Sequence, residues 1–171
     1  MAKKHNALNK KSEFFSKSFW FALKFFIIFS VLYALLFILD FSPIENWLAS
    51  LEAGFLGLNA VGNSVSINDF TYVISQSCIG LFSGIVLFAI IFACKKPGLK
   101  AKIAMAIAGA AALFLLNIPR VYLVLWAGQN FGPSAADLTH FASWFATTFF
   151  IIAVWYLLAE KIVGKEFKEL I

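Results

Sequence analysis

The sequence predicts an all-α membrane protein with about four transmembrane helices, an interfacial helix on the outer face and a short extracytoplasmic β-hairpin or loop. Hydrophobic residues make up 61% of the 171 residues and charged residues only 13%, against about 45–50% and about 25% in soluble domains. Several apolar runs are long enough to cross the roughly 30 Å of a bilayer core. Lysines flank these runs instead of alternating with exposed aromatic residues, which argues against a nucleic-acid partner.

The first transmembrane helix is predicted at residues 19–39, after a basic tail formed by residues 1–18. This apolar run is about twice as long as the core of a signal peptide, and no small-residue cleavage site follows it. We therefore expect a retained signal anchor. Lys24 lies near its start, where a long side chain reaches back to the membrane surface.

A short helix is predicted within residues 40–58. Ser42-Pro43-Ile44-Glu45 has the form of a capping box with proline at the first helical position. Glu52 and Glu45 fall outside an apolar stripe at helical spacing, which comprises Ile44, Trp47, Leu48, Leu51, Phe55 and Leu58. Two interpretations remain open, a helix lying in the outer membrane interface and a packing helix that covers the bundle.

The apolar period changes at residues 63–77. Alternating residues on either side of Asn68-Asp69 predict a hairpin with a two-residue turn, and an irregular loop is the alternative. Further transmembrane helices are predicted at residues 79–94, 103–126 and 138–158. The third is interrupted at residues 117–120, where Pro119 is expected to kink it. Residues 19–159 form a single membrane-embedded domain, and residues 160–171 form a second tail.

The distribution of lysine predicts the orientation in the cell membrane. Arg120 is the only arginine, so 13 of the 14 basic residues are lysines. All lie before or at the start of the first transmembrane helix, in the loop between the second and third, or in the C-terminal tail. By the positive-inside rule both termini are cytoplasmic. The outer segments carry carboxylates and no lysine, and these carboxylates are Asp40, Glu45, Glu52, Asp69 and Asp137.

Three reactive side chains are predicted to lie at one depth, near the outer face. An ionisable residue within a membrane helix such as Arg120 marks a functional site by default, the alternative being an anchor to lipid phosphate. Cys78 begins the second transmembrane helix and His140 lies at the outer start of the fourth. Each alone fits packing or capping, and their coincidence in depth is what suggests chemistry. Cys94 lies at the inner end, where packing or S-acylation is expected, and His5 is expected to be inert.

The chemistry that fits these residue types is acyl transfer through a thioester. A nearby cation or a helix N-terminus favours the nucleophilic thiolate of Cys78. The imidazole of His140 transfers protons near neutral pH, and Arg120 stabilises a thiolate or an oxyanion. Asn117 shares a helix face with Arg120. Asp137 either orients His140 or pairs with Ser134 at the start of the helix.

Residues 65–158 resemble the exosortase/archaeosortase family. The resemblance rests on Ser77-Cys78-Ile79-Gly80, on Asn117-Ile118-Pro119-Arg120 and on His140, in that order. It implies a membrane cysteine transpeptidase or protease with catalytic Cys78, Arg120 and His140 at the outer membrane face. Ile79 departs from the family, in which serine or threonine follows the cysteine. The chain resembles a minimal form of the family, and its Cys-x-Gly context leans towards the archaeal branch.

The resemblance also implies the partners. The substrates are secreted proteins that carry a C-terminal sorting signal made of a short motif, a transmembrane helix and a basic cluster. The signal is removed, and the protein passes to an envelope or lipid anchor. No cofactor or metal is expected, because two histidines and one outward cysteine make no zinc site. Two alternatives remain open. One is a hydrolase without transfer, and the other is a non-enzymatic transporter subunit or assembly factor with Arg120 as an anion or lipid site.

Overall fold

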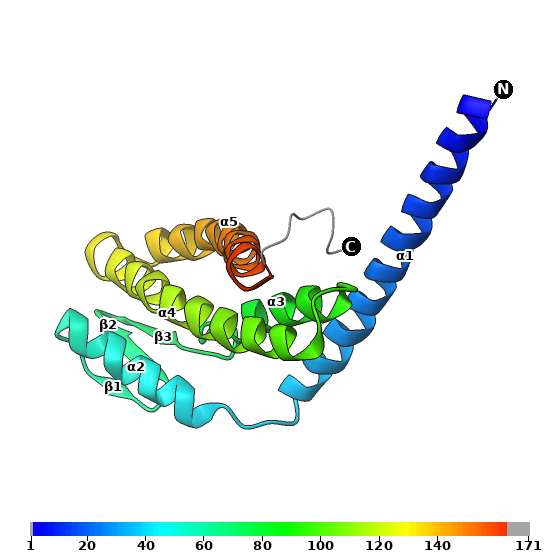
Figure 1. Ribbon diagram of the computed structural model, residues 1–171. Coiled ribbons are helices and arrows are strands. Elements are labelled where there is room, and N and C mark those ends of the chain that lie inside the picture. The colour runs from blue at the N-terminus through cyan, green and yellow to red at the C-terminus, as the bar shows by residue number, and fades with distance from the viewer. Residues whose placement is uncertain (1, 164–171) are drawn as a thin grey trace.

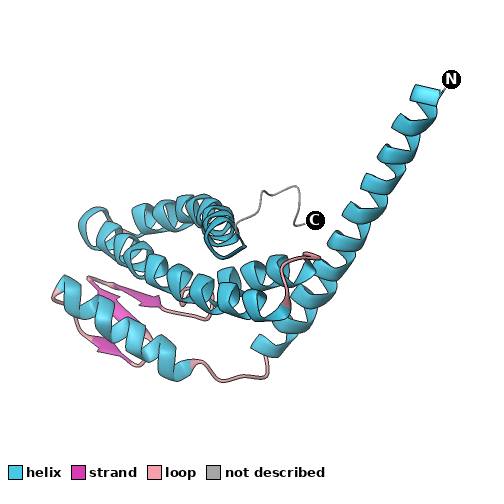
Figure 2. Ribbon diagram, viewed as in Figure 1, coloured by secondary structure: helices cyan, strands magenta, loops and turns pink. Residues whose placement is uncertain are grey.

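The computed structural model describes residues 2–163 of the chain. It is mostly helical, with one small sheet (Figures 1 and 2). The helices are α1 (Ala2–Leu36), α2 (Ser42–Leu56), α3 (Leu81–Ala93), α4 (Leu99–Phe131) and α5 (Pro133–Leu158), followed by a π-helical turn, η1 (Ala159–Val163). The strands are β1 (Ala60–Val61), β2 (Ser64–Ile67) and β3 (Phe70–Val73).

The helices form a bundle built around α4. α4 packs against both α3 and α5, and α1 packs against α3. The N-terminal part of α1 extends away from the bundle, while α2 and the sheet lie along one side of α4 (Figure 1). Among the described residues, two buried clusters hold this arrangement together, one between α2, the sheet and the C-terminal half of α4, and one between α3, α4 and α5.

Among the described residues, three helical segments are long and apolar enough to cross a membrane, namely Ser16–Leu36, Leu99–Phe131 and Pro133–Lys161. Only 6% of the most apolar window of the first is buried inside the protein, which is typical of a lipid-facing helix. The remaining predicted segment contains α3, whose 13 residues reach only about 20 Å. α3 is therefore shorter than predicted and falls below the length of an ordinary membrane crossing. Many large apolar side chains on α1, α4 and α5 are exposed.

Several element boundaries differ from those predicted. α1 begins at Ala2, so its helical backbone includes the predicted N-terminal tail, in which the sequence allows some helix. α4 runs without a break through residues 117–120, with Pro119 inside it. Such prolines persist in membrane helices because neighbouring groups satisfy the backbone that they free. α5 begins at Pro133, since proline is well suited to the first turn of a helix. Most of the predicted C-terminal tail, residues 164–171, lies outside the described residues.

α2 is confirmed as a helix, but not its capping box. Ser42 donates from its backbone nitrogen and its hydroxyl to Asp40 Oδ1, at 2.9 and 2.6 Å, instead of capping α2. These bonds hold the pKa of the Asp40 carboxyl below its ordinary value. Glu45 Oε2 accepts a hydrogen bond from Asn63 Nδ2 at 3.2 Å. Proline does stand in the first turn, as predicted.

The buried face of α2 also differs from the predicted stripe. Leu48, Ala49 and Ala53 are buried together with Glu52, whereas Trp47 and Phe55 are exposed. Small residues let a helix backbone approach its neighbour closely, and this face packs onto the sheet and α4. α2 thus packs against the bundle, as the second of the two interpretations expects.

The predicted hairpin is confirmed, because β2 and β3 pair antiparallel with Ile67 opposite Phe70. Asn68 in the turn has a φ of 54°, a left-handed conformation that asparagine tolerates. β1 adds a third strand that the sequence did not predict, since two residues carry no readable period. Val65 and Ile67 on β2 are buried in the core, which anchors the hairpin just ahead of Cys78.

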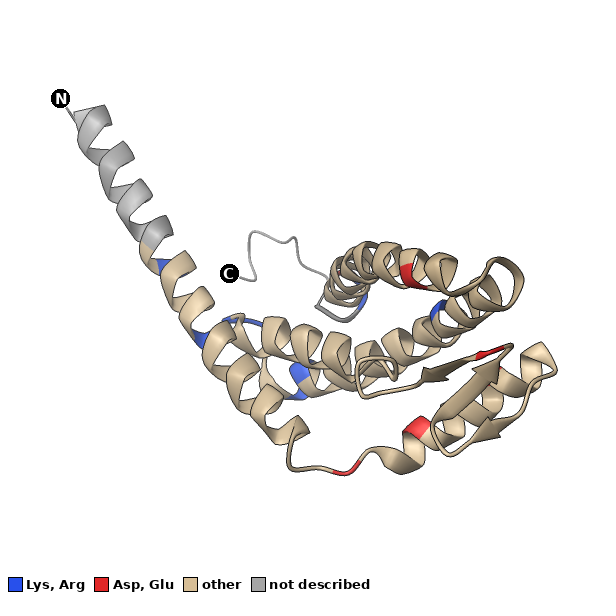
Figure 3. Ribbon diagram, turned by 180° about the vertical axis from the view of Figure 1, so that it is seen from behind, with Lys and Arg blue, Asp and Glu red and all other residues tan. Residues whose placement is uncertain are grey.

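Charge is unevenly distributed along the molecule. Figure 3 shows basic segments on α1 and close to the loop between α3 and α4, and most acidic segments on α2, the sheet and the first part of α5. Arg120 is the basic residue of the C-terminal half of α4. This separation agrees with the charge asymmetry in the sequence.

Candidate functional site

Cys78, Arg120 and His140 line one cavity of about 220 Å³. They come from three elements, namely the turn before α3, the middle of α4 and the first half of α5. Tyr72 of β3 and Asp137 of α5 line the same cavity. The structure therefore brings all three predicted site residues together, although they are separated by as many as 62 positions in the sequence.

Cys78 lies in a turn, not in the first turn of a helix as predicted. Its backbone nitrogen donates to the Ser75 oxygen at 2.8 Å, and α3 begins only at Leu81. Gly80 has a φ of 79°, and a Cβ there would lie 3.3 Å from the Asn117 side chain. The left-handed backbone conformation therefore favours glycine, and a Cβ would also make a tight contact with α4.

Asn117 joins this turn to Arg120. Its amide nitrogen donates to the Cys78 carbonyl oxygen, and its Oδ1 accepts from Arg120 Nη1 at 3.0 Å. Asn117 is buried, so both bonds are shielded from water. The predicted shared face of Asn117 and Arg120 is confirmed, and the bonds fix the turn that carries the thiol relative to the guanidinium.

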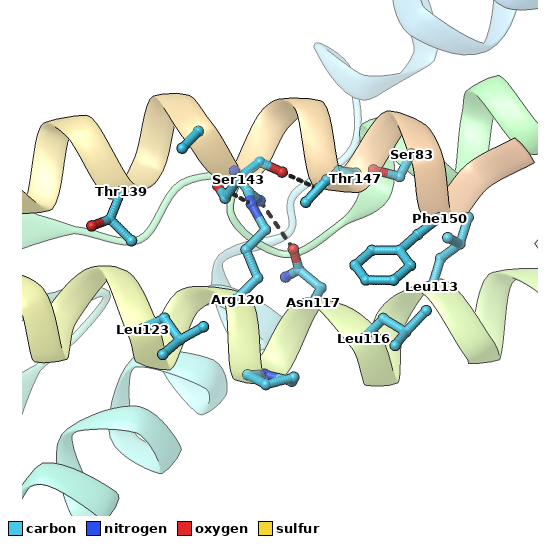
Figure 4. Close-up of a pocket in the computed structure, with 13 residues that line it drawn as sticks. Ser83, Leu113, Leu116, Asn117, Arg120, Leu123, Thr139, Ser143, Thr147 and Phe150 are labelled. Carbon is cyan, nitrogen blue, oxygen red and sulfur yellow. Dashed lines mark hydrogen bonds between the residues drawn. The ribbon is translucent and has the colours of Figure 1, made fainter. Parts of the chain in front are cut away.

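Ser143 joins Arg120 to α5. Arg120 Nε donates to Ser143 Oγ at 2.8 Å, and Ser143 Oγ donates to the His140 carbonyl oxygen at 2.6 Å. Figure 4 shows Arg120 reaching from α4 towards Ser143, with Asn117 beside it. Hydrogen bonds therefore connect the backbone of Cys78 to that of His140 through three side chains. Within the described residues, two of the five N–H donors of Arg120 have protein partners.

The charge of Arg120 acts on both other members of the site. Arg120 interacts electrostatically with Cys78 and with His140. A cation near a cysteine stabilises the thiolate. Since α3 begins three residues after Cys78, the predicted contribution from a helix N-terminus is not supported.

His140 is oriented by a neighbour on its own helix. Trp144 Nε1 donates to His140 Nε2 at 3.0 Å, so a neutral imidazole in this position carries its proton on Nδ1. Asp137 interacts electrostatically with His140. The hydrogen bond to the imidazole ring described above comes from Trp144 and not from Asp137. Trp144 and Ser143 follow His140 by four and three residues, a spacing that could have identified both from the sequence.

Tyr72 also lines this cavity, and no sequence pattern singles it out as a site residue. Its hydroxyl is buried and has no hydrogen-bond partner among the described residues. A Cβ on Gly128 would lie 2.7 Å from this hydroxyl, so glycine makes room for the ring. Burial, and then the negative charge of Asp137, raise the pKa of Tyr72. The phenol therefore stays protonated and available as a donor at the cavity.

A second, larger cavity of about 460 Å³ lies between α4 and α5 and shares Arg120 with the first. Figure 4 shows its lining, in which Leu116, Leu123 and Phe150 surround the polar group of Arg120, Asn117 and Ser143. It offers an apolar surface that leads to the charged centre. Among the described side chains, no group of three His, Cys, Asp or Glu residues lies together as a metal site would require.

No protein-family model, curated protein or solved structure matches the chain. What the site can do is therefore inferred from its own geometry and from the residues that it contains.

Cys78 should react with a mild alkylating agent faster than Cys94 at neutral pH. Cys78 is half-buried, whereas Cys94 is 4% exposed and burial disfavours its thiolate. The greater solvent exposure of Cys78 could by itself make it react faster than Cys94. The Arg120→Ala variant therefore tests whether Arg120 acts on the Cys78 thiol. We expect alkylation of Cys78 to slow about tenfold in that variant because less thiolate is present. Unchanged kinetics would show that Arg120 does not act on the thiol.

Proposed function

We propose that the chain is a membrane cysteine transpeptidase of the exosortase/archaeosortase type. It would cleave the C-terminal sorting signal of secreted proteins and transfer them to a lipid or another envelope anchor. The observation that supports this proposal most strongly is the single cavity lined by Cys78, Arg120 and His140. A nucleophile, a proton carrier and an oxyanion stabiliser are the parts that acyl transfer requires.

In the first step Trp144 releases Nε2 of His140, and this nitrogen takes the proton of Cys78 to leave the thiolate. The sulfur attacks the scissile carbonyl, and Arg120 stabilises the resulting oxyanion, assisted by the protonated phenol of Tyr72. The carbon–nitrogen bond then breaks, and the leaving amine takes the proton from His140. A thioester remains on Cys78. An acceptor hydroxyl or amine loses its proton to His140, attacks the thioester and restores the thiolate.

The larger cavity between α4 and α5 is where the apolar segment next to the scissile bond would lie. It is mostly apolar and shares Arg120 with the smaller cavity. A substrate carried on a membrane helix is confined to the same plane and depth as the enzyme, which contributes to orientation. The segment would thus present its scissile bond beside Cys78.

Cells that express the chain should contain secreted proteins that lack their C-terminal helix. In cells with His140→Ala or Arg120→Lys, we expect the same proteins to keep that helix, because lysine lacks the planar fork that binds an oxyanion through two donors. Mass spectrometry of membrane-protein C-termini measures this directly. Identical C-termini in wild-type and variant cells would exclude the enzyme.

The proposed topology has both termini in the cytoplasm and the site at the outer face. It includes α3 as a fourth, short membrane crossing and rests on the sorting of lysines. A cysteine introduced at Asn68 or Gln129 should react with a membrane-impermeant reagent in intact cells. A cysteine at Gly98 should react only after the membrane is opened. Labelling of Gly98→Cys in intact cells would contradict the proposed orientation and indicate the opposite one.

The non-enzymatic alternative is favoured by one observation, the apolar cavity with a single arginine at its polar part. Such a cavity suits a bound lipid or anion. The two functions differ at Cys78, because a binding protein would tolerate Cys78→Ser, whereas the transpeptidase would be inactive.

A further inference from the structure

A separate basic cavity of about 380 Å³ lies between α1 and the loop that follows α3. Its charged lining comes from Lys17 and Lys24 of α1 and from Lys95 and Lys96 of the loop. α3 runs from the turn of Cys78 towards this loop, so the cavity lies at the opposite end of α3 from the candidate site.

The α1 side of the cavity is one continuous helix face. Lys17, Trp20, Phe21 and Lys24 occupy positions i, i+3, i+4 and i+7, which lie above one another on a helix. Two aromatic rings are thus placed between two ammonium groups. The loop lysines approach this face from the end of α3.

Three lysines of this cavity have no carboxylate partner among the described side chains, namely Lys24, Lys95 and Lys96. A further lysine, Lys102, interacts electrostatically with Lys24. The ammonium group of Lys102 donates to the Cys94 carbonyl oxygen at 2.5 Å. Several like charges therefore gather at one place, and a bound anion would offset their repulsion.

We propose that this cavity binds the phosphate headgroup of an anionic membrane lipid. The ammonium groups would contact the phosphate, and Trp20 and Phe21 would pack beside the glycerol and the upper acyl chains. Basic cavities between membrane helices are the usual binding sites for such headgroups. The membrane-crossing window of α1 is only 6% buried within the protein, so lipid has direct access to it. The aromatic wall favours a lipid over free phosphate.

The test uses the purified full-length chain and measures bound phosphatidylglycerol and phosphatidylcholine by native mass spectrometry. Phosphatidylglycerol should be retained preferentially. The double variant Lys24→Gln/Lys95→Gln should bind it about thirtyfold more weakly, since each lysine contributes about a fivefold gain. Lys24→Arg/Lys95→Arg should bind as the wild type does. If circular dichroism shows that the double variant loses helicity, lipid binding is measured on the single variants Lys24→Gln and Lys95→Gln instead.

The matched control is Lys100→Gln/Lys161→Gln, which removes the same charge from lysines outside the cavity lining. This control should keep wild-type affinity. An equal loss in both double variants would mean diffuse attraction to the surface and would overturn the proposal. Equal retention of the two lipids, or displacement of lipid by millimolar inorganic phosphate, would overturn it as well.

Discussion

Replacing Cys78 with alanine is expected to leave the substrate protein uncleaved in the membrane, with processing slowed by roughly a thousandfold or more. The physical reason is that acyl transfer through a thioester has no route without the sulfur. Asn117 binds the Cys78 carbonyl oxygen rather than the sulfur, so the turn keeps its main contact with α4. Immunoblotting of a tagged substrate during expression measures the ratio of precursor to product.

Cys94→Ala is the matched control, because it removes the only other cysteine of the chain. Cys94 is buried at the opposite end of α3 among apolar residues. Substrate processing should therefore continue at the wild-type rate. If Cys78→Ala converts the substrate as fast as Cys94→Ala does, the transpeptidase proposal is wrong and the non-enzymatic alternative takes its place.

The second large effect concerns stability and rests on Glu52. Its side chain is 0% exposed, and neither carboxylate oxygen has a hydrogen-bond partner among the described residues. Burial raises the pKa of Glu52 from 4.5 to about 7. Because the folded pKa is raised, the folded state holds its proton while the unfolded state has lost it. The free energy of unfolding should therefore fall as pH rises from about 4.5 to about 7.

Glu52→Gln should remove this part of the pH dependence. The shift corresponds to about 3 kcal/mol above pH 7, so the variant should be more stable there by up to that amount and little changed near pH 4.5. Thermal unfolding in detergent across this range measures the effect. Glu52→Asp keeps an ionisable group and serves as the control. A Gln variant with an unchanged pH profile would show that the carboxylate is not the cause.

Glu52 also shows where pattern reasoning fails in this molecule. By helical spacing, Glu52 lies outside the apolar stripe of α2. In a membrane protein, large apolar side chains also face lipid, so their stripe does not identify the packed side. The small residues Ala49 and Ala53 mark the packed face of α2, and Glu52 lies on that face with them.

The candidate site was more accessible to sequence reasoning. Helix rise and the positive-inside rule fix the depth of a residue along a membrane helix, which is why Cys78, Arg120 and His140 could be grouped. They do not fix rotation about the helix axis. The bonds between elements, from Asn117 to the Cys78 carbonyl oxygen and from Arg120 to Ser143, therefore required the structure. The turn that carries Cys78 depends on the left-handed Gly80, and apolar periodicity does not reveal it.

The most direct test of the proposed chemistry is a search for the thioester on Cys78. Cells that express the wild-type chain and a processed substrate are quenched in acid, and the peptide that contains Cys78 is analysed by mass spectrometry. We expect an adduct of the substrate's new C-terminus on Cys78 that hydroxylamine releases and that is absent from Cys94. Continued conversion of the substrate with no adduct on Cys78, even when the acceptor is withheld, would contradict the thioester mechanism.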